Sequence, residues 1–156
     1  MTHFDWIADG LRLVDTPGEQ SMFEKEVAFT SGILQKIKAT PLAKGLVLYD
    51  EIFHSTNPPD ATRASQLFCS ELWKHRNCLS LISTHVYSLA REAPPTSVKQ
   101  LCLGTWVNAK GEYSFSYKLH RGVCTISSVD LLLKQFGYDI SVQCGKTSEF
   151  KPASDS

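Results

Sequence analysis

The apolar run from Leu46 to Tyr49 stops abruptly at two adjacent carboxylates, Asp50 and Glu51. A continuous apolar run of this length, bounded by turn residues, predicts a strand that is buried on both faces, as in parallel sheets. Two carboxylates at the end of a buried strand cost free energy unless a cation or hydrogen-bond donors stabilise them. In nucleotide hydrolases the cation is magnesium, and the second carboxylate orients the attacking water. The same pattern also fits a strand that runs out into a solvated loop.

A long helix is expected before this strand. Ser21 stands three residues before Glu24, which is the spacing of a capping box. Apolar residues then recur at near-helical intervals, and they are Phe23, Val27, Ile33, Leu34 and Ile37. The pattern predicts a helix from about Met22 to Ala39. A helix N-terminus that carries a serine is also a ready anion site.

A second helix and a second strand are expected after the carboxylates. Asp60 ends a proline-containing turn and can cap a helix that runs to about His75. The segment from Leu79 to Ser83 is then predicted to form another buried strand. This order of strand, helix and strand predicts a right-handed parallel crossover.

A histidine follows the second predicted strand, in the pair Thr84 and His85. If the crossover is parallel, this histidine lies beside Asp50 and Glu51, because the carboxyl ends of parallel strands meet at one edge of the sheet. A histidine in that place can reach a γ-phosphate. A single histidine after a strand is more often an ordinary loop residue, so its expected proximity to the carboxylates carries the functional interpretation.

The distal part of the chain has a different pattern. Two strands, over 98–107 and 113–119, are joined by a glycine-containing turn, which predicts an antiparallel hairpin at the edge of the sheet. Ser127 or Ser128 then caps a short helix that ends at Gly137. We expect one folded domain over residues 1–142 and a polar, disordered tail over 143–156.

Three motifs in this order resemble the ATPase domain of MutS-family mismatch-repair proteins, across about residues 18–137. The segment 21–27 resembles the family's signature segment, in which a serine, a phenylalanine and a glutamate recur at these spacings. Asp50-Glu51-Ile52, with Thr56 and Asp60, reproduces the family's D-E-I-x-x-x-T-x-x-x-D pattern. Ser83-Thr84-His85 is similar to its A-T-H switch. The distal segments resemble the family's closing strand, G-x-x-x-x-S segment and helix, and they are Tyr117-Lys118-Leu119, Gly122, Ser127 and Ser128.

The resemblance implies a fold, two cofactors and a role for each motif. The fold is a partial three-layer P-loop NTPase-like α/β domain of the ABC class, with a mainly parallel sheet, an antiparallel edge hairpin and flanking helices. The cofactors are ATP and magnesium. Asp50 is implied as the magnesium-side carboxylate, Glu51 as the catalytic residue that positions water, and His85 as the γ-phosphate sensor.

The remaining motif residues are implied to bind nucleotide, partly across a subunit interface. Ser21, Thr56 and Asp60 are the nucleotide-binding residues of the resemblance, and Ser21 and Asp60 act across the dimer. MutS proteins dimerise through these domains, so a homodimer or heterodimer is expected. DNA would be bound by regions outside this chain, and mismatched DNA is the implied target.

The chain departs from the family pattern at several places, among them the turn that carries Pro58-Pro59 and an extra residue between Gly18 and Ser21. Phe53 and His54 stand where the family usually has glycine and arginine. The phosphate-binding loop, G-x-x-x-x-G-K-[ST], is missing, because Ile140 occupies the first glycine position before Gly145-Lys146-Thr147. We therefore expect a C-terminal piece or a truncated product that does not hydrolyse ATP by itself.

Composition limits the partners and the compartment. Sixteen basic residues balance 16 acidic residues, so no overall basic field holds a polyanion. Five cysteines without C-x-x-C spacing do not indicate a disulfide framework or a zinc site. No apolar stretch is long enough for a membrane span, and no signal peptide is recognisable. We expect a soluble protein of the cell interior, in the cytoplasm or nucleus, that has no membrane partner.

Two other functions remain open at this point. A non-catalytic module that keeps the dimerisation surface would regulate or bind a partner without hydrolysing ATP. A fragment of another ABC-class ATPase, such as a transporter or a chromosome-maintenance protein, would share the acidic pair and the histidine. Those families carry an L-S-G-G-Q-like run, to which the segment 18–21 is only weakly similar.

Overall fold

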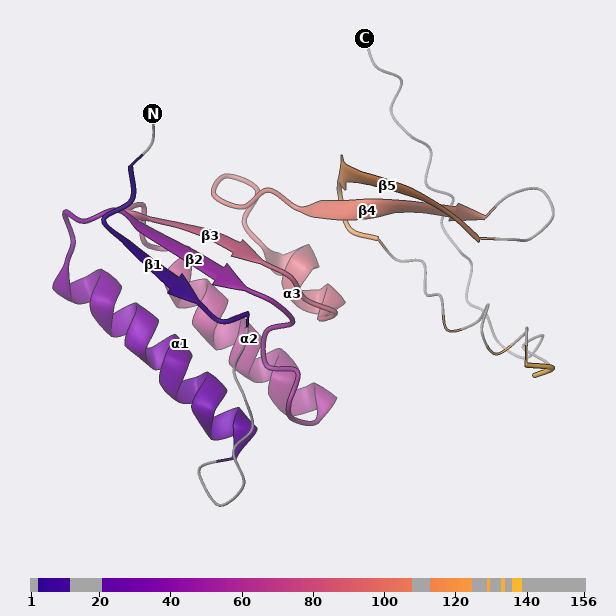
Figure 1. Ribbon diagram of the computed structural model, residues 1–156, viewed down its shortest axis with the longest axis horizontal. Coiled ribbons are helices and arrows are strands. Elements are labelled where there is room, and N and C mark those ends of the chain that lie inside the picture. Colours follow the sequence, from indigo (N-terminus) through magenta and orange to yellow (C-terminus); the bar gives the residue numbers. More distant parts are fainter. Residues whose placement is uncertain are drawn as a thin grey trace, which may run out of the picture. The chain divides into compact units, whose positions relative to one another are not determined.

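In the computed structural model, the described residues are 3–11, 21–107 and 113–124, together with 129, 133 and 136–138. The chain divides into two compact units, Met1–Val98 and Lys99–Ser156. The first unit contains β1 (Trp6–Asp9), α1 (Met22–Ala39), β2 (Gly45–Tyr49), α2 (Pro58–Leu72), β3 (Cys78–Ile82) and α3 (Tyr87–Glu92) (Figure 1). The second contains β4 (Leu101–Val107) and β5 (Tyr113–Arg121). The fold class is therefore α/β, as the sequence predicts.

The first unit is built on a three-stranded sheet in the order β1-β2-β3. Both neighbouring pairs are parallel, with Ile7 opposite Leu46 and Leu46 opposite Leu79. The predicted parallel crossover between β2 and β3 is thus confirmed. The strand β1 was not predicted, because its apolar run, Trp6-Ile7-Ala8, is only three residues long and shows no regular alternation.

Helix α1 has the predicted bounds, and a capping box explains where it begins. The Glu24 amide donates to Ser21 Oγ at 3.3 Å, and the Ser21 amide donates to Glu24 Oε2 at 2.8 Å. The two residues thereby satisfy two amide groups that the first helical turn leaves unpaired.

Helix α2 begins at Pro58, and its cap is Asn57 rather than Asp60. The Asp60 amide donates to Asn57 Oδ1 at 3.1 Å. Two prolines fit the first helical positions, because the amide that proline lacks would have no intrahelical partner there. The predicted start at Asp60 is therefore wrong by one helical turn, and the helix ends at Leu72 before the predicted His75.

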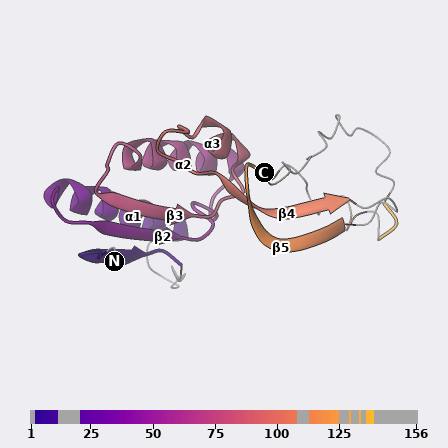
Figure 2. The ribbon, with the colours of Figure 1, turned by 90° about the horizontal axis from the view of Figure 1, so that it is seen from above.

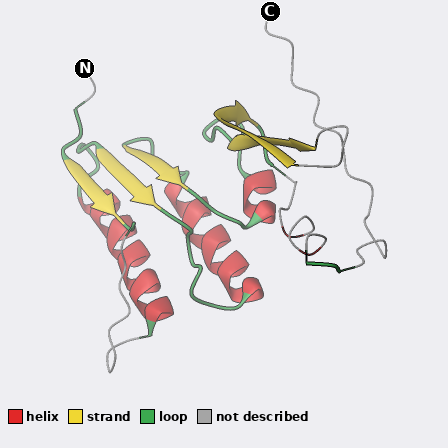
Figure 3. Ribbon diagram, turned by 45° about the vertical axis from the view of Figure 1, so that its right-hand side comes forward, coloured by secondary structure: helices red, strands yellow, loops and turns green. Residues whose placement is uncertain are grey.

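Only one face of the parallel sheet is covered by helices within the described residues (Figure 3). Trp6, Val47 and Tyr49 on this face are buried in one cluster with Ile37 of α1 and Leu72 of α2. The opposite face carries an apolar set, of which three side chains are largely exposed: Ile7 at 62%, Leu79 at 60% and Leu81 at 64%. The prediction that β2 and β3 are buried on both faces is therefore wrong for this part of the chain.

The second unit contains an antiparallel pair of strands, as predicted. Leu103 lies opposite Leu119, and the register then shifts before the pair Thr105 and Phe115. The backbone of Tyr117 is left-handed near this irregularity, with φ 53°. Among the described residues, β4 and β5 pair only with one another and form a separate sheet (Figure 2), so the predicted place at the edge of the parallel sheet is not observed.

Part of the C-terminal prediction falls outside the described residues. This applies to Ser127, Ser128, the tail and the segment 145–147. Gly137 has a φ of 84°, and the Tyr138 amide donates to the Leu133 carbonyl at 2.9 Å. These two features are typical of a glycine that ends a helix. No helix in the described ranges is long and apolar enough to cross a membrane.

Candidate functional site

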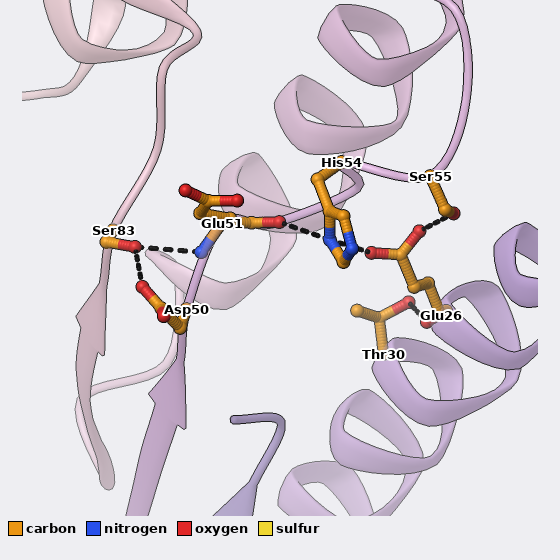
Figure 4. Close-up of polar contacts among 7 residues, drawn as sticks. All are labelled: Glu26, Thr30, Asp50, Glu51, His54, Ser55 and Ser83. Carbon is orange, nitrogen blue, oxygen red and sulfur yellow. Dashed lines mark hydrogen bonds and ion pairs between the residues drawn. The ribbon is translucent and has the colours of Figure 1, made fainter. Parts of the chain in front are cut away.

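Asp50 and Glu51 follow the carboxyl end of β2, where Ser83 from the end of β3 holds both of them (Figure 4). The Ser83 hydroxyl donates to Asp50 Oδ1 and accepts from the Glu51 amide at 2.8 Å. The Ser83 amide in turn donates to the Tyr49 carbonyl at 2.9 Å. One serine side chain therefore fixes a carboxylate and the backbone of the next residue. The sequence placed Ser83 at the strand end but gave it no role in the site.

The loop after β2 contains two residues with left-handed backbone. Glu51 has a φ of 49° and Phe53 a φ of 54°. Residues other than glycine are uncommon in this conformation. The steric strain costs on the order of 1 kcal/mol or more for each such residue. The side chain of Phe53 is 2% exposed and packs on Phe23 at a centroid distance of 6.0 Å. Burial of this ring thus helps to hold a strained turn that presents Glu51.

His85 lies beside the acidic pair, as the sequence predicts. Its Nε2 is 3.3 Å from Glu51 Oε1. The two side chains are 84% and 51% exposed, so the ion pair adds little stability by itself. Both groups remain accessible to a ligand at the edge of the sheet.

A buried glutamate on α1 is connected to the same loop. Glu26 is completely buried, and Ser55 Oγ donates to its Oε2. The Nδ1 atom of His54 is 3.3 Å from Glu26 Oε1 and 3.1 Å from the Glu51 carbonyl oxygen (Figure 4). The imidazole therefore bridges α1 and the backbone of the acidic pair.

Glu26 has no predicted function, although its place on helix α1 carries a signal. The buried positions of α1 are Glu26, Thr30, Ile33 and Ile37, which share one helical face. A charged residue on a buried face requires compensating partners. That position therefore marks Glu26 as a residue with specific contacts.

A cavity of about 240 Å³ lies at the ends of β1 and β2. Among the described residues, its polar lining comes from Glu26, Tyr49, Asp50, Glu51 and His54, and Gly10 and Leu11 also line it. Burial raises the pKa of the Tyr49 hydroxyl well above its ordinary value, and the charge of Glu26 raises it further. The cavity is thus lined by carboxylates and by a tyrosine that stays neutral.

The other predicted site residues make local contacts. Ser21 is occupied in the capping box, and Asp60 Oδ2 accepts from Asn57 Nδ2 at 2.7 Å. Thr56 is half-buried in the loop that precedes α2. In the described ranges, none of these three side chains hydrogen-bonds to the acidic pair or to His85. The structure therefore brings together Asp50, Glu51 and His85, whereas Ser21 and Asp60 take part in the N-terminal caps of α1 and α2.

A magnesium ion fits this site only if ligands from elsewhere complete its coordination shell. No group of three or more acidic, histidine or cysteine side chains among the described residues can hold a metal ion. Magnesium usually retains several waters and binds one or two carboxylates together with substrate phosphates. Asp50 matches that requirement, because Ser83 bonds its Oδ1 and no described group bonds its Oδ2.

Comparison with known proteins adds no family assignment. No protein-family model matches the chain, and no curated protein sequence matches it. The function must therefore be argued from the residues and from their geometry.

Proposed function

We propose that the chain carries the C-terminal half of a MutS-like ATPase domain, of the P-loop NTPase fold. In the complete protein, magnesium-dependent ATP hydrolysis would be coupled to the binding of mismatched DNA in DNA mismatch repair. The observation that carries this proposal is the meeting of Asp50, Glu51 and His85 at the carboxyl ends of adjacent parallel strands. Ligands of open α/β sheets bind at this edge.

Each residue at this edge has a distinct task in the proposed site. Magnesium, when bound with the nucleotide phosphates, supplies positive charge that balances the charge of the transferring phosphoryl group. Asp50 would hold this ion or one of its waters through Oδ2. Glu51 would orient the attacking water or accept its proton, and His85 would contact the γ-phosphate from the neighbouring strand.

Ser83 and Phe53 are positioning residues in this proposal. Ser83 fixes the rotamer of Asp50 and the amide of Glu51 with one hydroxyl group. The position of Phe53, where the MutS family usually has glycine, has a backbone φ of 54°. Glycine adopts this conformation without a steric penalty. The backbone at position 53 therefore has the conformation that a glycine in the family motif would favour. This geometry supports the resemblance in addition to the sequence.

The rest of the proposed domain would come from outside the described residues. The exposed apolar face of the sheet is the surface that a half-domain leaves open, and the missing part would cover it and form the third layer. That part would also supply the phosphate-binding loop. Ser21 and Asp60 would contact nucleotide held by a second subunit, so that the active form is a homodimer or heterodimer.

A non-catalytic module is the second candidate. It is favoured by the observation that Asp50, Glu51 and Ser21 already have partners within the chain, which gives each of them a structural role. Such a module would use the same surfaces for dimerisation and regulation. Nucleotide binding separates the two functions.

The decisive experiment measures nucleotide binding and hydrolysis with and without the upstream half. We expect the isolated 156-residue chain to bind magnesium-ATP weakly. Addition of the polypeptide encoded upstream should produce ATPase activity. Glu51→Gln should then lower the rate by about 10²-fold or more while ATP binding persists. The matched change Glu71→Gln, on the exposed side of α2, should leave the rate unchanged.

Two results would reject the catalytic proposal. One is a complete upstream reading frame that has no phosphate-binding loop. The other is full ATPase activity in the Glu51→Gln protein. In either case the non-catalytic module would be the better description.

A further inference from the structure

The first unit separates its charges between two ends. Helices α1 and α2 end where β2 and β3 begin, so the loops between them gather at the amino edge of the sheet, opposite the acidic pair (Figure 1). Five exposed cations in and beside these loops form the basic end of the unit, and they are Lys36, Lys38, Lys44, Lys74 and Arg76. Among the described residues of the first unit, only Asp5 and Glu71 bring carboxylates to this edge. With the histidines neutral, the basic end therefore has a net charge of +3, although the chain as a whole is neutral.

Hydrogen bonds between the loops hold the basic end in one shape. The Asn77 side chain donates to the carbonyls of Thr40 and Ala43, at 3.3 Å and 3.2 Å, and so ties the loop after α2 to the loop after α1. The Lys44 amide donates to Asp5 Oδ2 at 2.7 Å, which fastens the loop after α1 to the segment before β1. Because this framework is already ordered, less conformational entropy is lost when its side chains bind a partner.

Contacts between elements show that the cations share one surface. The hydrogen bond and ion pair with Lys74 lower the pKa of the Glu71 carboxyl, and the charge of Lys38 on α1 lowers it further. Lys36 Nζ lies 5.0 Å from the ring centroid of Trp6, at the start of β1. Within the described part of the chain, Lys74 is the only one of the five cations that forms an ion pair. Four of the cations are therefore available to a charged partner.

The ends of the helices explain only part of this charge. Cations are favoured in the last turn of a helix, because the carbonyl groups there carry partial negative charge. Lys36 and Lys38 lie in the last turn of α1 and fit this explanation. The last turn of α2 contains no basic residue. Lys44, Lys74 and Arg76 lie outside the helices, so the helix ends do not account for them.

An apolar side chain stands among these cations. Leu42 is 96% exposed, although its loop is closed by a hydrogen bond of 3.1 Å from the Ala43 amide to the Thr40 carbonyl. A partner that fits the whole surface must combine negative charge with apolar groups. A nucleic-acid duplex has both, because its phosphates flank grooves into which proteins insert side chains such as leucine.

Other anionic partners fit this surface less well. A single nucleic-acid strand is held by bases that stack on exposed aromatic rings, and the two loops expose no Phe, Tyr or Trp side chain. A membrane surface is held by several apolar side chains together, whereas Leu42 is the only large apolar side chain exposed in the two loops. An acidic polypeptide offers charge without a groove for Leu42.

We propose that the basic end binds the phosphate backbone of a nucleic-acid duplex. Lys44 and Arg76, one from each loop, contact phosphates, and Leu42 lies against the groove between them. Because the chain has no net charge, this contact is local and adds to any DNA contacts of the rest of the protein. The surface does not depend on the proposed ATPase function, because none of its residues has a task in that reaction.

The test is fluorescence anisotropy of a labelled DNA duplex, titrated with the whole 156-residue chain. The duplex has about 30 base pairs, and the salt concentration is varied from about 20 to about 200 mM. We expect saturable binding and a slope of log K against log salt of about −3 to −4, because each neutralised phosphate contributes about −0.9. A single strand of the same length should bind more weakly.

Variants connect the binding to the basic end. Lys44→Ala and Arg76→Ala should each weaken duplex binding by about three- to tenfold and reduce the magnitude of the salt slope by about one. Leu42→Ser should weaken binding without a change in the slope, because no charge is lost. Arg63→Ala removes the same charge from an exposed position in the first half of α2 and should change neither quantity. All four positions are exposed, so the variants should fold.

Several results would overturn the proposal. One is the absence of saturable duplex binding by the folded chain, and another is an equal loss of affinity in Arg63→Ala and Lys44→Ala, which would show a response to total charge alone. Equal or tighter binding of polyglutamate would indicate an acidic protein partner. Binding of phosphatidylserine vesicles without binding of the duplex would indicate a membrane. None of these measurements uses ATP or the upstream half, so failure of this surface is distinguishable from failure of the ATPase proposal.

Discussion

The ring of Phe53 packs against the ring of Phe23, with centroids 6.0 Å apart, and this contact fastens the loop after β2 to the first turn of α1. The same loop contains the left-handed residues Glu51 and Phe53. Its conformation therefore depends on tertiary packing as well as on the hydrogen bonds of Ser83.

At position 53, glycine should give a more stable protein than alanine, which is the reverse of their usual order in stability. Both Phe53→Ala and Phe53→Gly lose a buried ring, which costs roughly 3–5 kcal/mol. Glycine relieves the left-handed strain that alanine keeps, so Phe53→Gly should be more stable than Phe53→Ala by about 1 kcal/mol. Urea denaturation of the two variants measures this difference. At Ala39, at the end of α1, the change to glycine should instead be destabilising. If alanine were more stable than glycine at both positions, the strain argument would be contradicted.

Removal of the Ser55 hydroxyl should destabilise the first unit through Glu26. Ser55→Ala leaves Glu26 Oε2 buried without its donor, and an unsatisfied buried group costs about 1–3 kcal/mol. In the Glu26→Gln background the charge is gone, so Ser55→Ala should cost less. A double-mutant cycle by urea denaturation measures the coupling. Additive effects would show that the two side chains do not interact.

Alkaline pH should lower the free energy of unfolding through a buried thiol. Burial raises the pKa of Cys69 from 9.0 to about 12. Between these values the unfolded chain has lost the proton that the folded chain still binds, so stability falls as pH rises from about 9 to about 12. One group contributes about 1.4 kcal/mol per pH unit over this window.

Cys69→Ala provides the comparison for this pH dependence. Without the thiol, the slope of unfolding free energy against pH should be shallower by about one proton. Tyr49, whose pKa is also raised, contributes a slope of the same sign that persists in this variant. Identical slopes for wild type and Cys69→Ala would show that the thiol does not control this stability.

A charge on the open face of the sheet should leave the isolated chain folded but block its association with the upstream half. Leu81 is 64% exposed, so Leu81→Lys should change stability by no more than about 0.5 kcal/mol. Under the proposed function, the same lysine would be buried without a partner in the complete domain. Co-purification with the upstream polypeptide measures the effect. Leu67→Lys, at a position on α2 that is 59% exposed, is the matched control and should still co-purify.

Local patterns in the sequence were sufficient for α1 and for the acidic edge of the sheet. The capping box of Ser21 and Glu24 fixed where α1 begins, because both partners lie within one turn of helix. The apolar run before Asp50 and the order of strand, helix and strand were enough to place His85 beside Glu51. These predictions needed only short-range periodicity and one topological rule.

Features that depend on distant partners were not predicted. A continuous apolar run such as that of β2 does not reveal whether both faces are covered within the same chain. Asn57 and Asp60 are equally good cap residues, so the start of α2 was decided by the prolines between them. The contacts of Glu26 with the segment around His54 involve residues 28 positions apart, and no local pattern records them.

The bridge from Glu26 through His54 to the Glu51 carbonyl also has a mechanical consequence. Helix α1 begins at Met22, one turn before Glu26, and a helix of 18 residues moves nearly as a rigid body. A partner that shifts the start of this helix must therefore displace the imidazole and, with it, the backbone that presents Glu51. Contact at the start of α1 and the geometry of the acidic pair are thus coupled through this imidazole, beside the contact of Phe23 with Phe53.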